Sequence, residues 1–508
     1  MDQSISRRGL IAGGAAASLA ALGPVALGMA EESLAASADY STQALVIGGG
    51  FGGLCATAHL AYAGLNPILI EASVRCGGAA FFCSGTMGIG TNDITWELIL
   101  QNSQFAEPAL SAAYMEAWDE FGEWLQEETD APAVWDGKYV KVGGDEFASP
   151  EGNIEFAKYM VSYIEENGGT VLTQTRGFEL ITNESGAVIG AKAYDAEGKI
   201  ITFDAANVVL YCGGYAAHKG LLESFMSPYG SLLGTRTSPF NDGAGLRMGL
   251  SVGGKMARGM SSFYGHHIPY PWITTTTPEE WNEKIVDDAF IPQQQGIFSN
   301  IQSWGKYCIY VNQNGLSYGD EALGDNVLCQ LTAQQKWCRA FVILDQNIRE
   351  NKVGKSKRLD KERIEIIKDA GGTVLEAETL EELAQKLFDE WKVPKANLLR
   401  TVAEYNEAAK AGTAADLVVP KNNVDFSIPI EEGPFYAVVT VPGISTNYGG
   451  LVIDTSARVL GANDEPIPGL YAEIGTAGGL TYDGNIGALS SIISFAWLAT
   501  RDIIAKSA

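Results

Sequence analysis

Basic side chains are scarce in this chain, and their scarcity limits its possible partners. The 508 residues contain 35 Lys and Arg against 61 Asp and Glu, which gives a net charge of −26. A surface that binds DNA or RNA needs clustered Lys and Arg to neutralise phosphates. We therefore expect no nucleic-acid partner, and an acidic surface suits a basic redox partner better.

Cysteine is also sparse, and the cysteines follow no ligand pattern. Seven are scattered between Cys55 and Cys338, with no C-x-x-C or C-x-x-C-H sequence. Zinc and iron–sulfur sites need clustered thiols, and covalent haem attachment needs the C-x-x-C-H pattern. We expect no metal centre, no haem and no disulfide framework.

Hydrophobic runs long enough to span a membrane are absent beyond the first 38 residues. Within that segment, Arg7-Arg8 precedes an apolar run rich in Ala and Gly over residues 10–30, and small residues follow at 36–38. This order is typical of a twin-arginine signal, which exports proteins across the bacterial cytoplasmic membrane. We expect export to the periplasm or the cell surface, with a retained membrane anchor as the alternative.

Glycine, by contrast, is abundant, with 59 residues. An apolar run at 42–47 leads into the turn Gly48-Gly49-Gly50-Phe51-Gly52-Gly53. A small-residue helix is expected over 54–63, and a second apolar run at 68–70 ends at Glu71. This order of strand, G-x-G-x-x-G turn, helix, strand and acid predicts a dinucleotide site.

Each residue of this fingerprint has a physical role. Gly48 makes the tight turn, Gly50 lets backbone N–H groups approach a pyrophosphate, and Gly53 lets the helix lie close to the strand. The helix N-terminus then faces the negative charge, and Glu71 is expected to hold the ribose hydroxyls. A glycine turn that serves packing alone is the alternative, and the fingerprint does not separate FAD from NAD.

The segments that follow favour a long cofactor. A second glycine pair, Gly77-Gly78, would let the backbone approach its far end. A β-meander that closes on Gly213-Gly214 is typical of the divided FAD domain of flavoproteins. Its strands are expected over 169–181, 188–193, 200–203 and 207–210.

The middle of the chain changes character, which predicts a second domain. It is aromatic and irregular at first, with capped helix starts at Thr277 and Thr379 and an amphipathic helix over 398–409. The predicted fold is α/β: a Rossmann-like FAD-binding domain that is split in two along the chain and carries a β-meander, plus an inserted α+β cap. The boundaries are a signal at 1–38, a first FAD-binding segment at 39–254, the cap at 255–435, and a second FAD-binding segment at 436–508.

Taken in order, the motifs resemble those of the FAD-dependent fumarate reductase / 3-ketosteroid dehydrogenase superfamily, the flavoprotein subunit of flavocytochrome c type. The resemblance covers essentially all of residues 42–508. Besides the fingerprint and Gly77-Gly78, the matching sequences are VVLYCGGY at 208–215, NDGAGLRMG at 241–249, YVNQNGLSYGDE at 310–321, GPFYA at 433–437, GGLVID at 449–454 and GLYA at 469–472. It implies non-covalent FAD, an active site between flavin and cap, and redox chemistry at a carbon–carbon bond beside an electron-withdrawing group.

The resemblance also implies a set of FAD-binding residues. They are Gly48, Gly50, Phe51, Gly53, Glu71, Ala72, Gly77, Gly78, Ala79, Gly177, Cys212, Gly213, Gly214, Asp242, Gly475, Gly487 and Ala488. One departure falls at Glu473-Ile474-Gly475, where the family carries Ala-Gly-Glu or Ala-Gly-Asn to hold the ribityl chain.

Other departures concern the substrate. Asp483 stands where fumarate enzymes carry an Arg, Ser445 and Thr446 replace their histidine pair, and Gly324-Asp325 lies where another Arg belongs. An acid in place of the Arg, at Asp483, would repel a dicarboxylate, so fumarate and succinate are not expected substrates.

The turn from Thr481 to Gly487 looks more like the ketosteroid dehydrogenase branch. By that resemblance, the Tyr482 hydroxyl and the backbone N–H of Ile486 would grip a ketone oxygen and stabilise its growing negative charge. A packed, hydrogen-bonded Tyr482 is the alternative. The proton partner is expected to be His266 or His267, with Tyr264 and Tyr318 as further candidates.

The resulting prediction is a reductase of the C=C bond in an α,β-unsaturated carbonyl compound, with hydride transfer from FAD N5 to the β-carbon. The alternatives are a ketosteroid-type dehydrogenase, which desaturates its substrate, and a non-catalytic exported flavin or electron-transfer protein. A flat, apolar small molecule is expected as substrate, from the aromatic residues Phe263, Tyr264, Tyr270, Trp272 and Trp304, with ordinary core packing of these residues as the alternative. A membrane cytochrome or a quinol is the expected electron donor.

Overall fold

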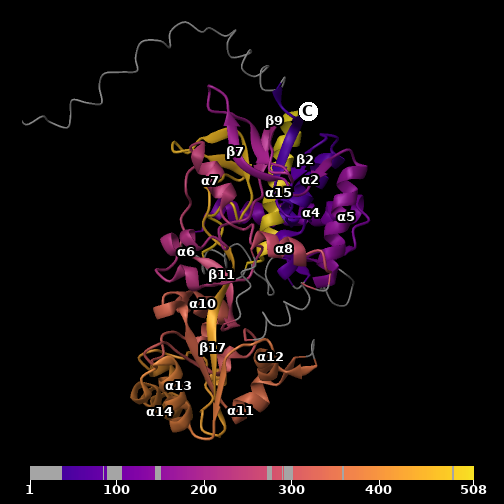
Figure 1. Cartoon of the computed structure of the whole chain (residues 1–508). Coiled ribbons are helices and arrows are strands. Elements are labelled where there is room, and N and C mark those ends of the chain that lie inside the picture. Colours follow the sequence, from indigo (N-terminus) through magenta and orange to yellow (C-terminus); the bar gives the residue numbers. More distant parts are fainter. Residues whose placement is uncertain are drawn as a thin grey trace, which may run out of the picture.

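The computed structural model describes residues 37–83, 85–88, 106–142, 150–271, 277–288, 290, 301–356, 360–482 and 486–507. The segment predicted as an export signal, up to residue 36, and also Trp272 and Asp483 lie outside the described residues. The described chain forms an upper and a lower lobe in the view of Figure 1.

The upper lobe is built on an eight-stranded sheet in the order β18-β19-β9-β1-β2-β6, with β8 paired to β9 and β7 to β8. The strands are β1 (Tyr40–Ile47), β2 (Ile68–Ile70), β6 (Thr170–Leu172), β7 (Arg176–Thr182), β8 (Val188–Tyr194), β9 (Ile200–Leu210), β18 (Arg458–Leu460) and β19 (Pro466–Ala472). β6, β2, β1, β9 and β19 are parallel to their neighbours in this row. All three residues of β2 are buried, as expected for a parallel strand covered on both faces.

The parallel strands end at one edge of the sheet. Ile47 of β1 pairs with Ile70 of β2 and Leu210 of β9, and Leu210 also pairs with Ala472 of β19. Because β1 connects to β2 on one side and lies beside the later strand β9 on the other, this edge is a topological switch point. Open α/β sheets bind their ligands at such points.

The strand predictions for the meander need two corrections. The strand expected over 169–181 is two strands, because Gln174 adopts a positive φ of 51° between β6 and β7. The two strands expected over 200–203 and 207–210 are the single strand β9, because β1 pairs with it from Phe203 to Leu210 and keeps the intervening residues extended.

Helices cover the sheet. α2 (Phe51–Tyr62) follows β1, and α15 (Ala488–Ser507) packs against both α2 and α4 (Pro108–Glu128), while α5 (Pro150–Glu166) packs on α2. Contrary to the expectation that no such run follows residue 38, α15 is, among the described residues, the one helix long and apolar enough to cross a membrane. Most of it is buried between α2, α4 and the sheet, as in the core helix of a globular domain. A small sheet of β3 (Thr86–Gly88), β5 (Tyr139–Val142) and β4 (Ala133–Trp135) adjoins α4.

The lower lobe is organised by β17 (Phe435–Asn447), a long strand that runs from its far end towards the upper lobe (Figure 1). The first half of β17 pairs with β13 (Ala340–Asp345) and β16 (Val374–Ala377). The second half pairs with β11 (Phe263–Pro269) and β10 (Gly234–Thr235). β12 (Ile309–Val311) completes the sheet beyond β13.

The remaining helices are mostly short and are divided between the two lobes (Figure 1). They are α6 (Lys219–Phe225), α7 (Ala244–Ser251), α8 (Pro278–Lys284), α10 (Asp325–Ala333), α11 (Gln346–Ile348), α12 (Arg363–Asp369), α13 (Leu380–Trp391) and α14 (Lys395–Ala411). The two predicted helix caps are confirmed. Thr277 accepts from the Glu280 backbone N–H, and Thr379 forms a capping box with Glu382.

Two hydrophobic cores result. One surrounds the parallel sheet, and the other is formed by residues between Ile301 and Val439 around β13 and the first half of β17. Trp281, Cys329 and Cys338, from the segment predicted as the cap, pack in the upper core. The predicted fold class, an α/β FAD-binding fold with an added α+β lobe, is confirmed, while the residue boundaries of the domains stay a prediction.

Candidate functional site

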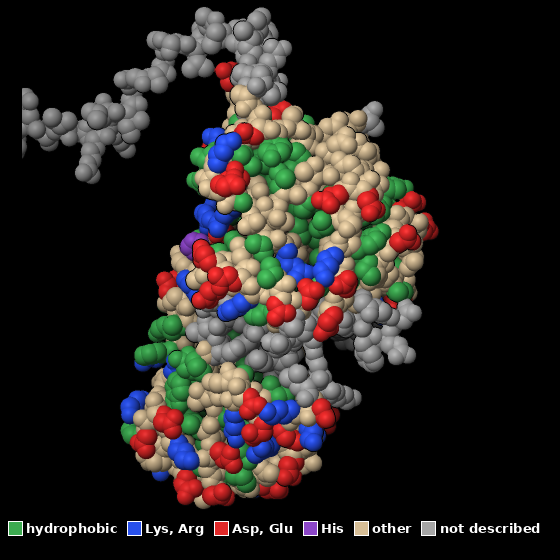
Figure 2. All heavy atoms as spheres, turned by 45° about the vertical axis from the view of Figure 1, so that its right-hand side comes forward, with side chains coloured by type: hydrophobic (Ala, Val, Ile, Leu, Met, Phe, Trp, Pro, Cys, Tyr) green, Lys and Arg blue, Asp and Glu red, His purple; other side chains and the backbone are tan. Residues whose placement is uncertain are grey.

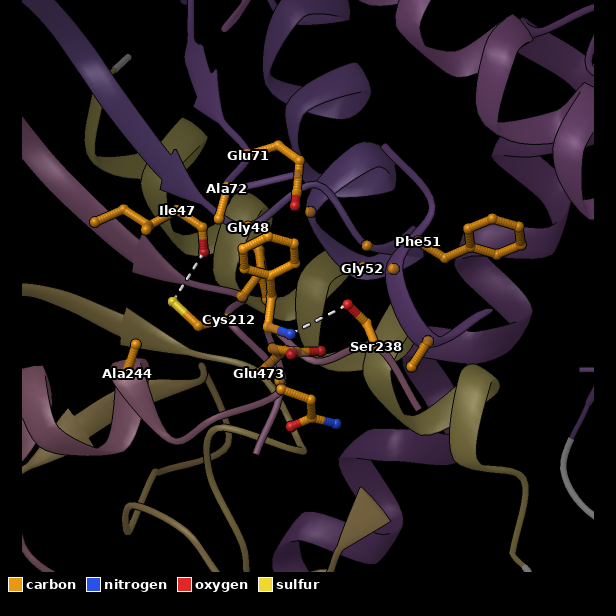
Figure 3. A pocket seen from close by; sticks show the side chains of 18 of the residues that line it. Ile47, Gly48, Phe51, Gly52, Glu71, Ala72, Cys212, Ser238, Ala244 and Glu473 are labelled. Carbon is orange, nitrogen blue, oxygen red and sulfur yellow. Dashed lines mark hydrogen bonds between the residues drawn. The ribbon is translucent and has the colours of Figure 1, made fainter. Parts of the chain in front are cut away.

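A cavity of about 880 Å³, including the solvent at its mouth, lies at the switch point of the sheet (Figure 3). Its floor is formed by the residues that directly follow three parallel strands: Gly48 after β1, Glu71 after β2 and Tyr211 after β9. Glu473, which follows β19, also lines it. Four turns, each following a parallel strand of the sheet, therefore meet at one site.

The N-terminus of α2 opens onto this cavity. A Cβ on Gly48 would lie 2.1 Å from the Tyr211 carbonyl oxygen, and a Cβ on Gly53 would lie 1.9 Å from the Gly48 oxygen, so both positions require glycine. No described atom lies within 4 Å of a Cβ on Gly50. The free first-turn N–H groups and the helix dipole favour an anion at this position.

Glu71 lies beside the turn. Its Oε2 accepts from the Gly49 N–H at 2.6 Å, and its Oε1 accepts from the Ser73 N–H at 2.7 Å. Burial raises the pKa of the carboxyl, against the lowering effect of these hydrogen bonds. The carboxyl is thus fixed at the cavity wall by the backbone.

The structure brings most of the predicted cofactor residues together around this cavity. Those that line it are Gly48, Gly50, Phe51, Gly53, Glu71, Ala72, Gly78, Ala79, Gly177, Cys212, Gly213 and Asp242. The ring of Phe51 points away from the cavity (Figure 3) and packs on Phe156, with ring centroids 5.0 Å apart. The Cys212 thiol donates to the Ile47 carbonyl at 3.3 Å.

The other predicted cofactor residues lie nearby but not on its lining. Gly77 supports the turn, since its N–H donates to the Gly49 oxygen at 2.8 Å. Gly214 makes room for Asn447, whose Oδ1 would lie 1.7 Å from a Cβ there, and Gly487 lies against the Gly88 carbonyl. Gly475 and Ala488 line a second pocket.

Sequence reasoning missed several residues of the lining. They are Thr175, Arg176, Ser238, Phe240, Asn241, Ala244 and Glu473. Asn241 and Ala244 lie in the matching sequence NDGAGLRMG, whereas the other four besides Glu473 follow no recognisable spacing and reach the cavity only through the folding of the chain. Glu473 falls within a departure from the family sequence.

The second pocket is smaller, about 350 Å³, and lies where β11 and β17 of the lower sheet meet α15. Ile492 of α15 lines both pockets, so the two adjoin. The lining consists of Tyr264, Thr446, Asn447, Tyr448, Ile474, Gly475, Thr481, Ile486, Ala488, Ser491 and Ile492. It is therefore a mainly apolar space beside the cofactor cavity, with a few hydroxyl groups.

Tyr264 connects this pocket to a buried polar chain. Its hydroxyl lies 2.9 Å from His266 Nε2, and His266 Nδ1 lies 2.7 Å from Asp325 Oδ2. Burial raises the pKa of Tyr264 to about 12, and burial together with the charge of Arg236 lowers the pKa of His266. Although burial raises it, the two neighbouring histidines lower the pKa of Asp325 overall.

The predicted proton donors lie behind Tyr264. His267 is fully buried, with Nδ1 at 2.6 Å from Asp325 Oδ1 and Nε2 at 2.8 Å from the Thr332 hydroxyl. Tyr318 lies further back, with its hydroxyl 2.5 Å from the same Thr332 oxygen. Neither lines the pocket, so among the described candidates Tyr264 is the one positioned to meet a substrate.

Of the two residues predicted to bind the ketone oxygen, Ile486 and Tyr482, only Ile486 lines the pocket. Ile486 lines the pocket, and its carbonyl accepts from the Tyr114 hydroxyl at 2.7 Å. The ring of Tyr482 packs against Gly259, where a Cβ would lie 1.9 Å from Cδ1, and Thr481 rather than Tyr482 lines the pocket. Burial, with a smaller contribution from Glu107, raises the pKa of Tyr482, while Arg258 lowers it. The carbonyl-gripping role of Tyr482 stays a prediction.

The aromatic residues expected around the substrate are mostly elsewhere, which corrects that expectation. Phe263 and Trp304 are buried in the upper and lower cores, and Tyr270 packs edge-on against Trp391. Only Tyr264 of the described set lines the pocket. The reason is strand alternation, which turns Phe263 inward when its neighbour faces the pocket.

A buried cation, Arg236, also belongs to this region and was missed from the sequence. It follows β10, and its Nη1 donates to the Ser445 hydroxyl at 3.2 Å. Its charge lowers the pKa of Tyr264 against the effect of burial. A positive charge thus lies close to the phenol.

The chain belongs to the FAD binding domain family, which matches residues 43–485. It is 28% identical over 356 residues to the NADH:acrylate oxidoreductase of Vibrio harveyi, which covers 69% of this chain and 32% of that protein. It is 29% identical over 394 residues to the 4-oxocyclohexanecarboxylate 2-dehydrogenase of Sinomonas cyclohexanicum, over 70% of this chain and 62% of that protein. The chain thus spans about a third and somewhat under two thirds of these relatives.

The fold is similar to that of solved structures. The 3-ketosteroid Δ1-dehydrogenase of Sterolibacterium denitrificans, solved with 1,4-androstadiene-3,17-dione, superposes with a TM-score of 0.71 at 18% identity, over 92% of this chain and 100% of that one. The predicted resemblance to the fumarate reductase / 3-ketosteroid dehydrogenase superfamily is confirmed.

FAD is the cofactor of this family and of this chain. The residues present fit it. The open first turn of α2 suits the pyrophosphate, Glu71 stands where a ribose hydroxyl is held, and the adjoining pocket offers space for a substrate.

Proposed function

We propose that this chain is an FAD-dependent oxidoreductase that reduces the C=C bond of an α,β-unsaturated carbonyl compound. The observation that carries the proposal is the Tyr264–His266–Asp325 chain, which ends in a mainly apolar pocket beside the cofactor cavity. A relative named for acrylate, an unsaturated acid, supports it.

The chain's own residues supply the acid and the electrostatics, while bound FAD supplies the hydride. The Tyr264 hydroxyl donates its proton to the α-carbon, and the positive charge of Arg236 stabilises the phenolate left behind. Neutral His266, held by Asp325, accepts from the Tyr264 hydroxyl and orients it, and the phenolate regains its proton from solvent after the product leaves. The Ile486 N–H, and Tyr482 if it turns towards the pocket, would stabilise the enolate oxygen.

An anaerobic assay tests this function. The flavin of the holoenzyme is reduced chemically, and enones, enoates and vinyl phenols are screened for the return of the oxidised absorption spectrum. An α,β-unsaturated carbonyl compound is expected to reoxidise the flavin, and the Tyr264→Phe variant is expected to do so far more slowly. If no enone or enoate reoxidises the flavin, the proposal is overturned, whatever the vinyl phenols do.

The second candidate is a dehydrogenase that desaturates a cyclic ketone, favoured by the 4-oxocyclohexanecarboxylate 2-dehydrogenase relative. The same pocket would then use Tyr264 as a base rather than an acid. Mixing the oxidised holoenzyme with saturated ketones separates the two directions, because only a dehydrogenase bleaches the flavin with them. A flavin that neither class of compound changes would favour the third alternative, a non-catalytic electron-transfer protein.

We further propose a small, flat and largely apolar substrate and an electron donor of the membrane cytochrome or quinol type. The apolar residues Tyr448, Ile474 and Ile486 around the second pocket support the first point. The relative named fumarate reductase (cytochrome), from Shewanella frigidimarina, supports the second. Steady-state reduction of the flavin by quinols or reduced cytochromes, compared one by one, tests it.

Export by the twin-arginine route completes the proposal. It is supported by Arg7-Arg8 and the apolar run over 10–30. Replacing both arginines with lysine in the full chain is expected to retain the protein in the cytoplasm, as measured by cell fractionation. Equal export of both forms would contradict this route.

A further inference from the structure

Glu473 is a buried acid at the cofactor cavity for which the reaction has no use. It is the first residue after β19 and is 3% exposed. In Figure 3 it reaches into the cavity from the side opposite Glu71. It therefore lies next to the cofactor without belonging to the substrate pocket.

One carboxyl oxygen of Glu473 has no hydrogen-bond partner among the described residues. This Oε2 would lie 3.1 Å from a Cβ on Gly52, in the first turn of α2. The carboxyl receives a hydrogen bond from the Gly213 backbone. Leaving a buried polar oxygen unpaired is costly, so the orphan oxygen points to a partner that the bound cofactor provides.

The groups around Glu473 give it no compensating positive charge. From each neighbouring element the described titratable groups are neutral or acidic, or already paired: Cys55 on α2, Glu71 after β2, Tyr211 and Cys212 after β9, and the ion pair of Arg176 with Asp242. α15 contributes the apolar Ile492. Burial raises the pKa of Glu473 well above its usual range.

We propose that Glu473 binds FAD as a neutral carboxylic acid, with its O–H donating to an oxygen of the chain that links the two ring systems of the cofactor. The first turn of α2 favours the negative charge of the pyrophosphate. An ionised carboxylate beside Gly52 would repel that charge, whereas a carboxylic acid donates to it or to a ribityl hydroxyl. The inference rests on FAD as the cofactor and not on the reaction proposed above.

FAD binding then becomes sensitive to alkaline pH. As pH rises through the pKa of Glu473, the acid loses the proton with which it donates and gains a charge that repels the pyrophosphate. The dissociation constant of FAD is expected to rise up to about tenfold for each pH unit above that pKa. Because the folded protein holds this proton more tightly than the unfolded chain, stability also falls as pH rises from the unfolded to the folded pKa.

The experiment measures release of FAD from the holoenzyme, by the fluorescence of free FAD on dilution, from about pH 6 to about pH 9, a range in which buried Glu side chains titrate. Circular dichroism at each pH verifies that the protein remains folded. Wild type is expected to release FAD more readily as pH rises. Glu473→Gln keeps a neutral donor and should give a flat pH profile, and Glu473→Ala should bind FAD about tenfold more weakly than Gln at every pH.

Glu71→Gln is the matched control, because it neutralises the other buried acid of the same cavity. It is expected to bind FAD more weakly but to keep the wild-type dependence on pH. The proposal is overturned if Glu473→Gln retains the wild-type pH dependence, if Glu71→Gln loses it instead, or if Glu473→Ala binds FAD as tightly as Glu473→Gln. Since the readout is FAD release, an enzyme inactive on every enone would leave this result unaffected.

Discussion

At the residue scale, the proposed chemistry depends most on Tyr264. The Tyr264→Phe variant removes only the hydroxyl that lies 2.9 Å from His266 Nε2. We expect turnover with an unsaturated substrate to fall by about 10²- to 10⁴-fold, the usual contribution of a general acid. The flavin absorption spectrum should not change, because Tyr264 does not line the cofactor cavity.

Tyr318→Phe is the control for this prediction. Its hydroxyl belongs to the same polar network through Thr332 but does not reach the pocket. Its loss should change turnover far less. Equal losses in the two variants would mean that the network has only a structural role and that Tyr264 is not the acid.

The loss of kcat at low pH, the acid limb of the pH profile, should follow the pKa of His266. Burial and the charge of Arg236 lower the pKa of His266, whereas Asp325 raises it. Asp325→Asn removes the raising contribution, so the acid limb of kcat is expected to move to lower pH in this variant. An acid limb that stays in place or moves to higher pH would show that the pKa of His266 does not set it.

At the element scale, the first turn of α2 separates two functions of glycine. Gly53→Ala would place a Cβ 1.9 Å from the Gly48 oxygen, so α2 must move away from β1. We expect a lower melting temperature even without FAD. Gly50→Ala meets no described atom within 4 Å and has an extended backbone with φ of −65°, so it should fold normally but bind FAD weakly.

Thermal unfolding with and without FAD checks this pair. Gly50→Ala should match wild type without the cofactor and gain less stability from adding it. Gly53→Ala should be destabilised in both conditions. If the two variants behave alike, Gly53 and Gly50 do not have separate roles in packing and in cofactor binding.

Elements set by local sequence were predictable, and elements set by distant partners were not. The strand–turn–helix around Gly48 and the caps at Thr277 and Thr379 follow from residues close in the sequence. The segment around Tyr264 looked irregular, yet it is the strand β11, because it pairs with β17 near the other end of the chain.

This missed strand explains why the sequence alone did not single out Tyr264. Alternation along β11 places Tyr264 and His266 on its less buried face and turns Phe263 and His267 inward. Asp325, which aligns His266, comes from α10, 59 residues further along the chain. A pattern of residue types could name the histidines but not the partner that orients them.

At the scale of the whole molecule, the two lobes share one site. The cofactor cavity is lined by the ends of strands of the upper sheet and by turns and helices beside them, whereas the second pocket takes Tyr264 and Thr446 from strands of the lower sheet. β17 connects the lower core to the second pocket, since its first half lies in that core and its second half reaches the pocket. Substrate contacts can therefore change with the lower lobe while the flavin site is kept.

The net charge of −26 predicts how an electron donor meets the protein. Acidic side chains are spread over both lobes on the face seen in Figure 2, with Lys and Arg among them. A basic donor should be attracted over long range, and salt should screen that attraction. We expect the bimolecular rate of flavin reduction by a basic cytochrome to fall as ionic strength rises, measured by stopped-flow absorption. A neutral quinol should show little salt dependence, and an acidic cytochrome should react faster with added salt, because salt then screens repulsion rather than attraction.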